Sequence, residues 1–205
     1  MRIPATIQGL PVREIGNSAF ARNARITSVV IPEGVTVIGN SAFEESHSLI
    51  SVTIPNTVTT IGTWAFQDCR ALTYISLPAS ITYIGQQVFG RSGLTSITWP
   101  PLVTTIRSAT FLGARSLQSI TIPEGITRIE SQAFQQTGLT SLDLPTTITQ
   151  IDGSAFSRCY SLIVVNIPDS VSSIRFWNQR AFEGSSNINL ASQARLRQVG
   201  YTGRF

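Results

Sequence analysis

The sequence predicts an α/β solenoid, a stack of similar coils in which neighbouring strands form a parallel sheet. A phenylalanine recurs every 22 or 23 residues along most of the 205-residue chain. A proline lies 11 residues before most of these phenylalanines, and a short stretch of alternating apolar and polar residues precedes each proline. Periods of this length are typical of repeat proteins, in which each unit packs only on its neighbours.

The recurring residues mark fixed positions in each coil. The phenylalanines are Phe20, Phe43, Phe66, Phe89, Phe111, Phe134, Phe156 and Phe182. The prolines that lie 11 residues upstream are Pro32, Pro55, Pro78, Pro100, Pro123 and Pro145. Pro168 precedes Phe182 by 14 residues, which indicates a three-residue insertion near Arg175–Asn178.

One complete unit runs over residues 49–69. In it, Val52 and Ile54 alternate with polar residues, which predicts a strand with one buried face. Pro55 should end this strand because proline has no N–H for further pairing. The apolar spacing around Phe66 suits a turn or two of helix. Each coil is therefore expected to contain a strand, a turn, a short extended segment and a helical turn.

The repeat resembles that of the BspA-like leucine-rich repeat proteins, most clearly at residues 54–69, Ile-Pro-Asn-Thr-Val-Thr-Thr-Ile-Gly-Thr-Trp-Ala-Phe-Gln-Asp-Cys. The resemblance covers about residues 3–185. It implies a leucine-rich-repeat right-handed solenoid with a parallel β-sheet on the concave face and short helical turns outside. Residues 3–12 resemble the family's usual lead into the first repeat, which suggests further sequence upstream.

The same resemblance implies a location and a class of partner. The family is found largely on bacterial surfaces and includes adhesins that bind host matrix and plasma proteins. An extracellular or cell-surface location is therefore implied. Met1-Arg2-Ile3-Pro4 is not a secretion signal, because no apolar stretch follows the charge, so the residues alone fit a mature fragment or a cytosolic protein.

The repeats predict a single leucine-rich-repeat domain over residues 1–205. It should begin with an opening segment and first partial repeat over residues 1–20. The repeats should continue over residues 21–186, and a C-terminal cap should follow over residues 187–205.

The expected cap carries most of the basic excess. Residues 171–205 hold five arginines and one acid, whereas the rest of the chain holds ten of each. Asn189–Val199 fits a short helix, and Gly200 suits its C-terminal end. Leu190 and Ala194, with Val199, are expected to cover the last repeat while the arginines face water. A solenoid needs such a cap with a polar outer face. The rival interpretation is a contact for anions or membranes.

The side chains that could take part in catalysis or metal binding are dispersed among different coils. Cys69 and Cys159 lie four repeats apart, or roughly 19 Å at a strand spacing of about 4.8 Å. A disulfide needs Cα atoms within about 7 Å, so both thiols should be unbridged and buried. His47 is the one histidine and should be solvated. Glu33 and Glu124 occupy matching positions in separate coils. The sequence therefore predicts no catalytic, cofactor-binding or metal-binding set, and no enzyme.

Two further partners are not expected. No apolar run approaches the roughly 18 residues of a membrane span. Basic residues are not spread along one face, as they usually are in a solenoid that binds nucleic acid.

The outward strand positions form the candidate binding surface for a protein partner. They are mostly serine and threonine, with Tyr74 as the large aromatic and Asp143 as the charged residue. The same small hydroxyl residues would also suit stacked strands that bind nothing. The predicted function is a binding or adhesion module; the alternative is a structural spacer in a larger surface protein. The candidate contacts are Ser51, Thr53, Tyr74, Ser76, Thr98, Thr121, Asp143 and Asn166.

The three tryptophans differ in their expected positions. Trp99 replaces an inward strand residue and should be buried. Trp64 should be exposed on the outer side, where it is a further candidate contact. Trp177 lies in the last insertion and could be exposed or fold over the cap.

Overall fold

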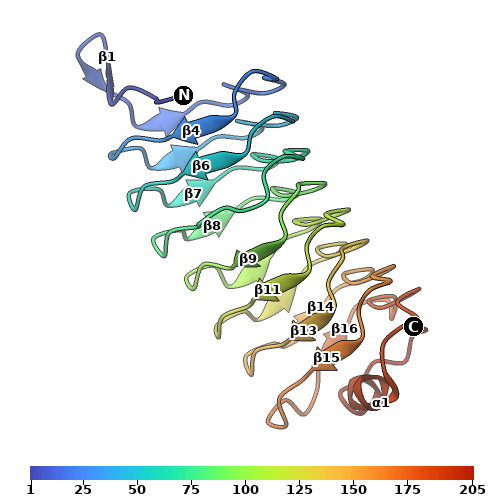
Figure 1. Ribbon diagram of the computed structural model, residues 1–205. Helices are drawn as coiled ribbons and strands as arrows, with labels where there is room; N and C mark the ends of the chain where they lie inside the picture. Colours follow the sequence, from blue (N-terminus) through green and yellow to red (C-terminus); the bar gives the residue numbers. More distant parts are fainter.

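The computed structural model describes residues 1–205, which form an elongated stack of coils (Figure 1). Each regular coil brings a short strand to one side of the stack, here called the strand face. The strands of this face are β4 (Ser28–Val30), β6 (Ser51–Thr53), β9 (Ser96–Thr98), β11 (Ser119–Thr121), β13 (Ser141–Asp143) and β15 (Val164–Asn166). A hairpin of β1 (Thr6–Ile7) and β2 (Leu10–Pro11) projects at the N-terminal end.

A second row of two-residue strands follows the proline turns. Its members are β3 (Glu14–Ile15), β5 (Val37–Ile38), β7 (Thr60–Ile61), β8 (Tyr83–Ile84), β10 (Thr105–Ile106), β12 (Arg128–Ile129), β14 (Gln150–Ile151) and β16 (Arg175–Phe176). Every pair in both rows is parallel, and residues one repeat apart lie opposite each other, as Val29 and Val52 do. The predicted parallel solenoid is therefore confirmed.

Pairing on the strand face is interrupted. β4 pairs with β6, β9 with β11, and β13 with β15, but residues 74–76 form no strand and β11 does not pair with β13. Two of the breaks coincide with connections that are one residue short. Gly93 and Gly138 lie in these connections, where an added Cβ would lie 2.1 Å from Arg70 O and 2.2 Å from Arg115 O, respectively. Glycine is required there because the preceding coil approaches so closely.

Turns take the place of the helical turns expected outside the sheet, and that part of the prediction is not confirmed. Ser41 and Glu45 have positive φ angles of 54° and 55°, which a helix does not allow. Alternate N–H groups then point to the next coil, as Phe43 N does to Ala65 O at 2.8 Å. A helix would direct all these donors along its own axis. The Phe-bearing turns, here called the turn face, form a ladder between coils.

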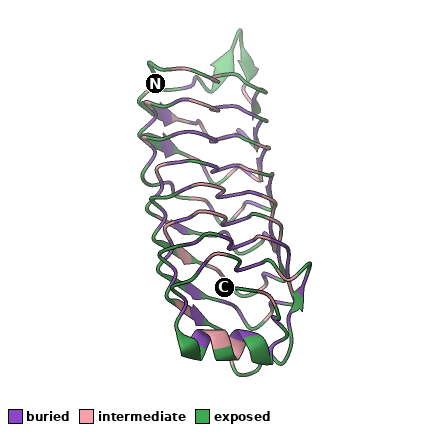
Figure 2. Cartoon of the chain, turned by 90° about the vertical axis from the view of Figure 1, so that its right-hand side faces the viewer, coloured by how far each residue is buried: buried purple, intermediate pink, exposed green.

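The core runs through the whole stack, with buried residues on the inner side of each coil (Figure 2). The repeated phenylalanines stack ring on ring from Phe20 to Phe182, with centroids 5.0 to 5.9 Å apart. Trp99 is buried as predicted and meets the edge of Phe111 at 5.8 Å. Burial of large aromatic rings supplies much of the stability of such a core.

The C-terminal end is closed by helix α1 (Leu190–Gln198). Asn189 caps its start by accepting a hydrogen bond from Ser192 N at 2.9 Å. The helix lies at the position predicted from the sequence, but its buried side is different. Val199 is buried as expected, whereas Leu190 is 82% exposed and Ala194 is also exposed, so neither covers the last repeat.

Tyr201 makes the main contact with the end of the phenylalanine stack. Its ring is fully buried and meets the edge of Phe182 at 5.4 Å. Phe176 also packs edge-on against both rings. Phe176 lies opposite Ile151 in the second row, so parallel pairing continues through the coil that carries the inserted residues. Trp177 is exposed beside Arg175.

Two arginines of the cap bind backbone carbonyls, which corrects the expectation that they simply face water. Arg195 donates to Pro168 O at 2.7 Å and to Val171 O at 2.8 Å. Arg197 donates to Gly203 O at 2.7 Å and stacks on the Phe205 ring. The cap is therefore fastened partly by its own positive charges.

Candidate partner-binding surface

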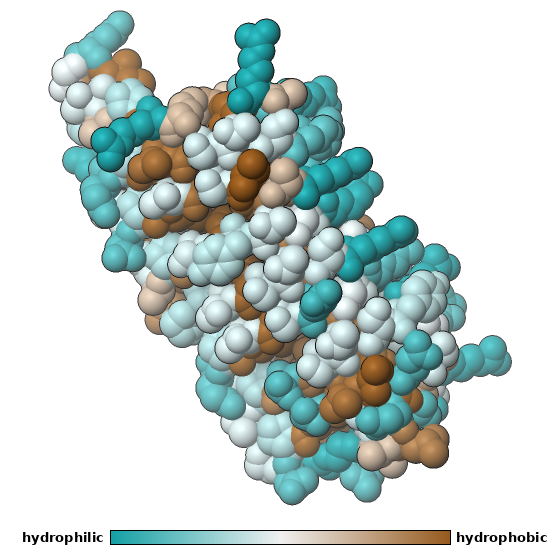
Figure 3. Space-filling model, viewed as in Figure 1, coloured by the Kyte–Doolittle hydropathy of each residue, from teal (hydrophilic) through white to brown (hydrophobic).

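The strand face brings the predicted contact residues onto one side of the molecule. All eight strand-face candidates are exposed, whereas residues between them are buried, such as Val52 in β6 and Leu142 in β13. This side faces the viewer in Figure 3, where pale, weakly polar residues cover much of its middle. The exposed set is Ser51, Thr53, Tyr74, Ser76, Thr98, Thr121, Asp143 and Asn166.

Trp64 does not belong to this surface. It lies in the turn between β7 and Phe66, where it is 43% exposed with a φ of 60°. Its indole Nε1 donates to Gln87 Oε1 at 3.1 Å. The structure therefore separates Trp64 from the other candidates.

Tyr74 lies at the centre of the interruption in the strand face. Its side chain is 64% exposed, while Ile75 beside it is 2% exposed and still packs in the core. No backbone N–H from residues 74–77 donates to another main-chain carbonyl. This segment lies between the coils of β6 and β9, so the lost pairing is an interruption within the strand face and not a free sheet edge. The sequence indicated the exposed ring but not the lost pairing around it.

Asp143 is engaged within the strand face. Its carboxylate accepts a hydrogen bond of 2.6 Å from Asn166 Nδ2, across the paired strands β13 and β15. The two predicted contacts therefore form one polar unit in place of two independent groups.

The cysteines have a structural role. Both are unbridged and fully buried, as predicted. Cys69 Sγ donates to Phe43 O at 3.1 Å, and Cys159 Sγ donates to Phe134 O at 3.0 Å. Ser46 Oγ makes the same contact one coil earlier, with Phe20 O. Burial raises the pKa of the Cys69 thiol to about 12 and also raises that of Cys159.

Titratable groups elsewhere form pairs and not a reactive cluster. Asp68 is buried and binds Arg70 at 3.1 Å and Arg91 at 2.8 Å. His47 is exposed, and its Nδ1 lies 2.8 Å from Asp68 O. No group of three or more histidine, cysteine, aspartate or glutamate side chains is arranged to hold a metal ion. α1 is the one helix, and it is too short to cross a bilayer. The sequence did not indicate the Asp68 pairs.

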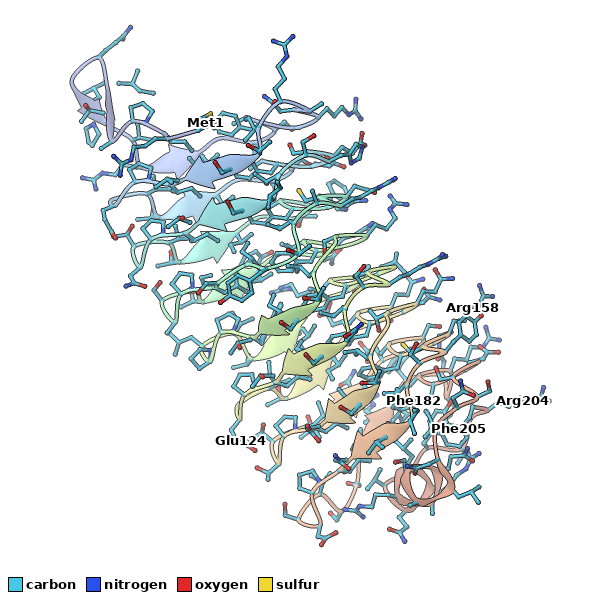
Figure 4. All side chains as sticks on the ribbon, viewed as in Figure 1. Met1, Glu124, Arg158, Phe182, Arg204 and Phe205 are labelled. Carbon is cyan, nitrogen blue, oxygen red and sulfur yellow. The ribbon has the colours of Figure 1, made fainter.

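The largest groove lies at the N-terminal end, where the strand prolines follow β4 and β6. It has a volume of about 800 Å³ and its floor is largely apolar. Figure 4 shows Met1 beside this end of the stack and Phe182 with Phe205 at the other. The lining residues are Arg2, Ile3, Pro4, Ala5, Val30, Ile31, Pro32, Glu33, Thr53, Ile54, Pro55 and Asn56.

Solved structures of bacterial leucine-rich repeat proteins are similar to this chain. A leucine rich cell surface protein from Faecalibacterium prausnitzii A2-165 is 35% identical, with a TM-score of 0.73 over 80% of this chain. A leucine-rich repeat protein from Eubacterium ventriosum is 29% identical, with a TM-score of 0.72 over 80% of this chain. The T. pallidum leucine rich repeat protein TpLRR is 26% identical, with a TM-score of 0.68 over the whole chain.

The chain spans only part of some of these proteins. It covers 46% of the Faecalibacterium protein and 44% of the Eubacterium protein, but 84% of TpLRR. No curated protein sequence matches the chain significantly. A family profile described as "BspA type Leucine rich repeat region (6 copies)" matches residues 13–137 and 82–201. Together these matches cover most of the solenoid, and the chain belongs to the BspA-type leucine-rich repeat family.

Proposed function

We propose that the chain is a non-enzymatic protein-binding or adhesion module of a bacterial cell-surface or secreted protein. The strand face is the surface that would meet a macromolecular partner. One observation carries this proposal: Tyr74 stands 64% exposed in the one strand-face segment that pairs with neither neighbour. Tyrosine is enriched at binding hot spots because it combines a large apolar ring with a polar end.

The surroundings of Tyr74 support the same role. Exposed hydroxyl groups of Thr53 and Ser76, with Thr98, offer donors and acceptors near the ring and lose little side-chain entropy on binding. The Faecalibacterium relative, described as a cell surface protein, supports an extracellular location. Host matrix and plasma proteins are the partners to test first.

A binding screen with paired tyrosine variants tests the proposal. The immobilised chain is exposed to matrix and plasma proteins, and the dissociation constant of any ligand is measured by surface plasmon resonance. Tyr74→Ser should weaken binding by about tenfold or more, as for a hot-spot residue. Tyr83→Ser is the matched control, since Tyr83 is 41% exposed in the second row beside Arg107. Equal affinity for both variants would exclude Tyr74 as an anchor.

A structural spacer is the second candidate. The unbroken phenylalanine stack from Phe20 to Phe182 favours it, because a continuous rigid core suits a rod that holds another domain. A spacer would bind none of the screened proteins. It would also tolerate substitution of Asp143 and Tyr74 with no loss of attachment by the intact surface protein.

A further inference from the structure

The second shortened connection opens a cavity on the molecule's surface. Its volume is about 300 Å³, which lies at the lower end of the range for small-molecule sites. The cavity lies where three successive coils meet, and Gly138 of the middle coil is part of its lining. Most of the lining residues have polar or charged side chains; the set is Arg115, Gln136, Thr137, Gly138, Arg158, Tyr160 and Ser161.

Two of the lining side chains are cations with no partner in the protein. Arg115 and Arg158 are exposed, and neither makes an ion pair, a side-chain hydrogen bond or a contact with an aromatic ring. No acidic residue lines the cavity. Figure 4 shows Arg158 at the edge of the stack, away from the strands. The cavity therefore presents uncompensated positive charge.

The first shortened connection differs in this respect. At Gly93, Arg70 and Arg91 both bind the buried Asp68 carboxylate, so each of these arginines has an anionic partner within the protein. The residue that corresponds to Asp68 at the second connection is Gly113. Both have positive φ angles, 56° for Asp68 and 70° for Gly113.

The backbone is also the same at these two positions. Arg70 N donates to Asp68 O at 2.9 Å, and Arg115 N donates to Gly113 O at 2.9 Å. The two connections share one backbone geometry, but Asp68 and Arg91 at the first correspond to Gly113 and Gln136 at the second. Because Gly113 has no carboxylate, Arg115 is free for an external anion.

We infer that this cavity binds an acidic sugar unit. Guanidinium groups bind carboxylates through paired, charge-assisted hydrogen bonds, and Arg115 and Arg158 supply two such groups. Gln136 and Ser161 offer polar atoms for sugar hydroxyls, and the Tyr160 ring, 60% exposed, offers a flat apolar surface. A polar cavity of this size suits a compact polyhydroxylated acid better than an apolar side chain. This site is separate from the strand face and does not depend on the proposed function.

Calorimetric titration of the full chain with simple glycosides tests the site. Methyl glucuronoside carries the ring and the carboxylate, methyl glucoside the ring alone, and inorganic sulfate a charge alone. Saturable binding is expected for the glucuronoside, weakening as salt is added because the attraction is electrostatic. Arg115→Gln and Arg158→Gln should each reduce the affinity at least tenfold.

Two further variants separate a site from general positive charge. Arg70→Gln removes an arginine from the corresponding place at the first connection and should leave glucuronoside binding unchanged. Gly113→Asp restores the missing carboxylate at a φ that Asp68 already adopts, and it should abolish binding. If Gly113→Asp fails to fold, as judged by its thermal unfolding, the two glutamine variants still decide the question.

Several outcomes would overturn the inference. Absence of saturable glucuronoside binding would do so. Equal affinity for sulfate would reduce the cavity to a general anion site, and equal affinity for methyl glucoside would remove the arginines from recognition. Loss of binding in Arg70→Gln equal to that in Arg115→Gln would show that no defined cavity is involved.

Discussion

The turn face and the strand face of the same coils differ in continuity. On the turn face, the phenylalanine rings stack without a gap from Phe20 to Phe182. On the strand face, pairing is lost on both sides of residues 74–76 and again between β11 and β13. The stack is therefore held in register at the turns, and the strand face accommodates the irregularities.

The shortened connections show how this division arises. Phe89 and Phe111 remain stacked at 5.6 Å across the coil that contains Gly93, and Phe134 and Phe156 at 5.0 Å across the coil that contains Gly138. The missing residue lies between the phenylalanine and the following strand, so the shorter connection affects strand pairing and not the stacking of the rings. Because the strand face can lose backbone pairing while the core stays intact, its shape and sequence can vary.

The largest effect should come from removal of the cap. Deletion of residues 187–205 uncovers the Phe182 end of the stack and removes the buried Leu196, Val199 and Tyr201. Burial of three such side chains contributes roughly 5 kcal/mol or more to the free energy of unfolding. The truncated chain should aggregate or unfold at a much lower temperature, as measured by light scattering and circular dichroism. Leu190→Ser, at an exposed site, is the control, and a soluble truncation with unchanged Tm would contradict the assignment.

Within the stack, a turn-face truncation should cost far more than one on the strand face. Phe111→Ala removes a fully buried ring and should reduce the free energy of unfolding by about 3–5 kcal/mol. Tyr74→Ala should change it by less than about 0.5 kcal/mol, as for other exposed sites. Urea denaturation followed by circular dichroism measures both. A loss below about 1 kcal/mol for Phe111→Ala would mean that the stack is not the main support.

The shortened connections themselves should be intolerant of a single methyl group. Gly138→Ala places a Cβ against Arg115 O and should cost about 1–3 kcal/mol in the free energy of unfolding. Gly16→Ala is the matched control, because nothing lies within 4 Å of a Cβ at that position. Denaturation curves of the two variants should therefore separate. Coinciding curves would show that the preceding coil can move away.

The smallest expected effect is in the reactivity of the two buried thiols, those of Cys69 and Cys159. A pKa of about 12 leaves Cys69 almost entirely protonated at pH 8, with roughly one thiolate in ten thousand molecules. Cys159 should behave similarly, since burial raises its pKa as well. Neither should react with a thiol reagent within hours in the folded state, and both should react once urea is added. Rapid labelling without urea would show that the turns open readily.

Much of the fold could be predicted from the sequence because the repeat fixes which residues must be buried. The spacing of Phe43 and Phe66 with their strand residues was enough for the parallel stack, the buried thiols and the exposed strand positions. The turns were not predictable in detail. Apolar spacing around Phe66 fits a helix as well as a turn, and positive φ at non-glycine residues such as Ser41 and Trp64 leaves no compositional signal.

The candidate sites were only partly predictable for a related reason. Exposure of Tyr74 follows from its place in the strand, but the unpaired backbone around it depends on packing between coils. The C-terminal helix lies where the sequence predicted one, yet the side that it buries and the carbonyl contacts of Arg195 depend on tertiary structure. The cavity beside Gly138 is lined by residues of three successive coils, so it depends on how those coils pack.

The ring stack also has an evolutionary consequence. Each coil touches only the coils before and after it, so duplication of one 23-residue unit would insert a new ring between two existing ones and leave both ends unchanged. Each such event would extend the reach of the molecule by roughly 5 Å, the spacing of neighbouring strands. A surface protein built in this way can change its length in fixed increments without the need for a new core.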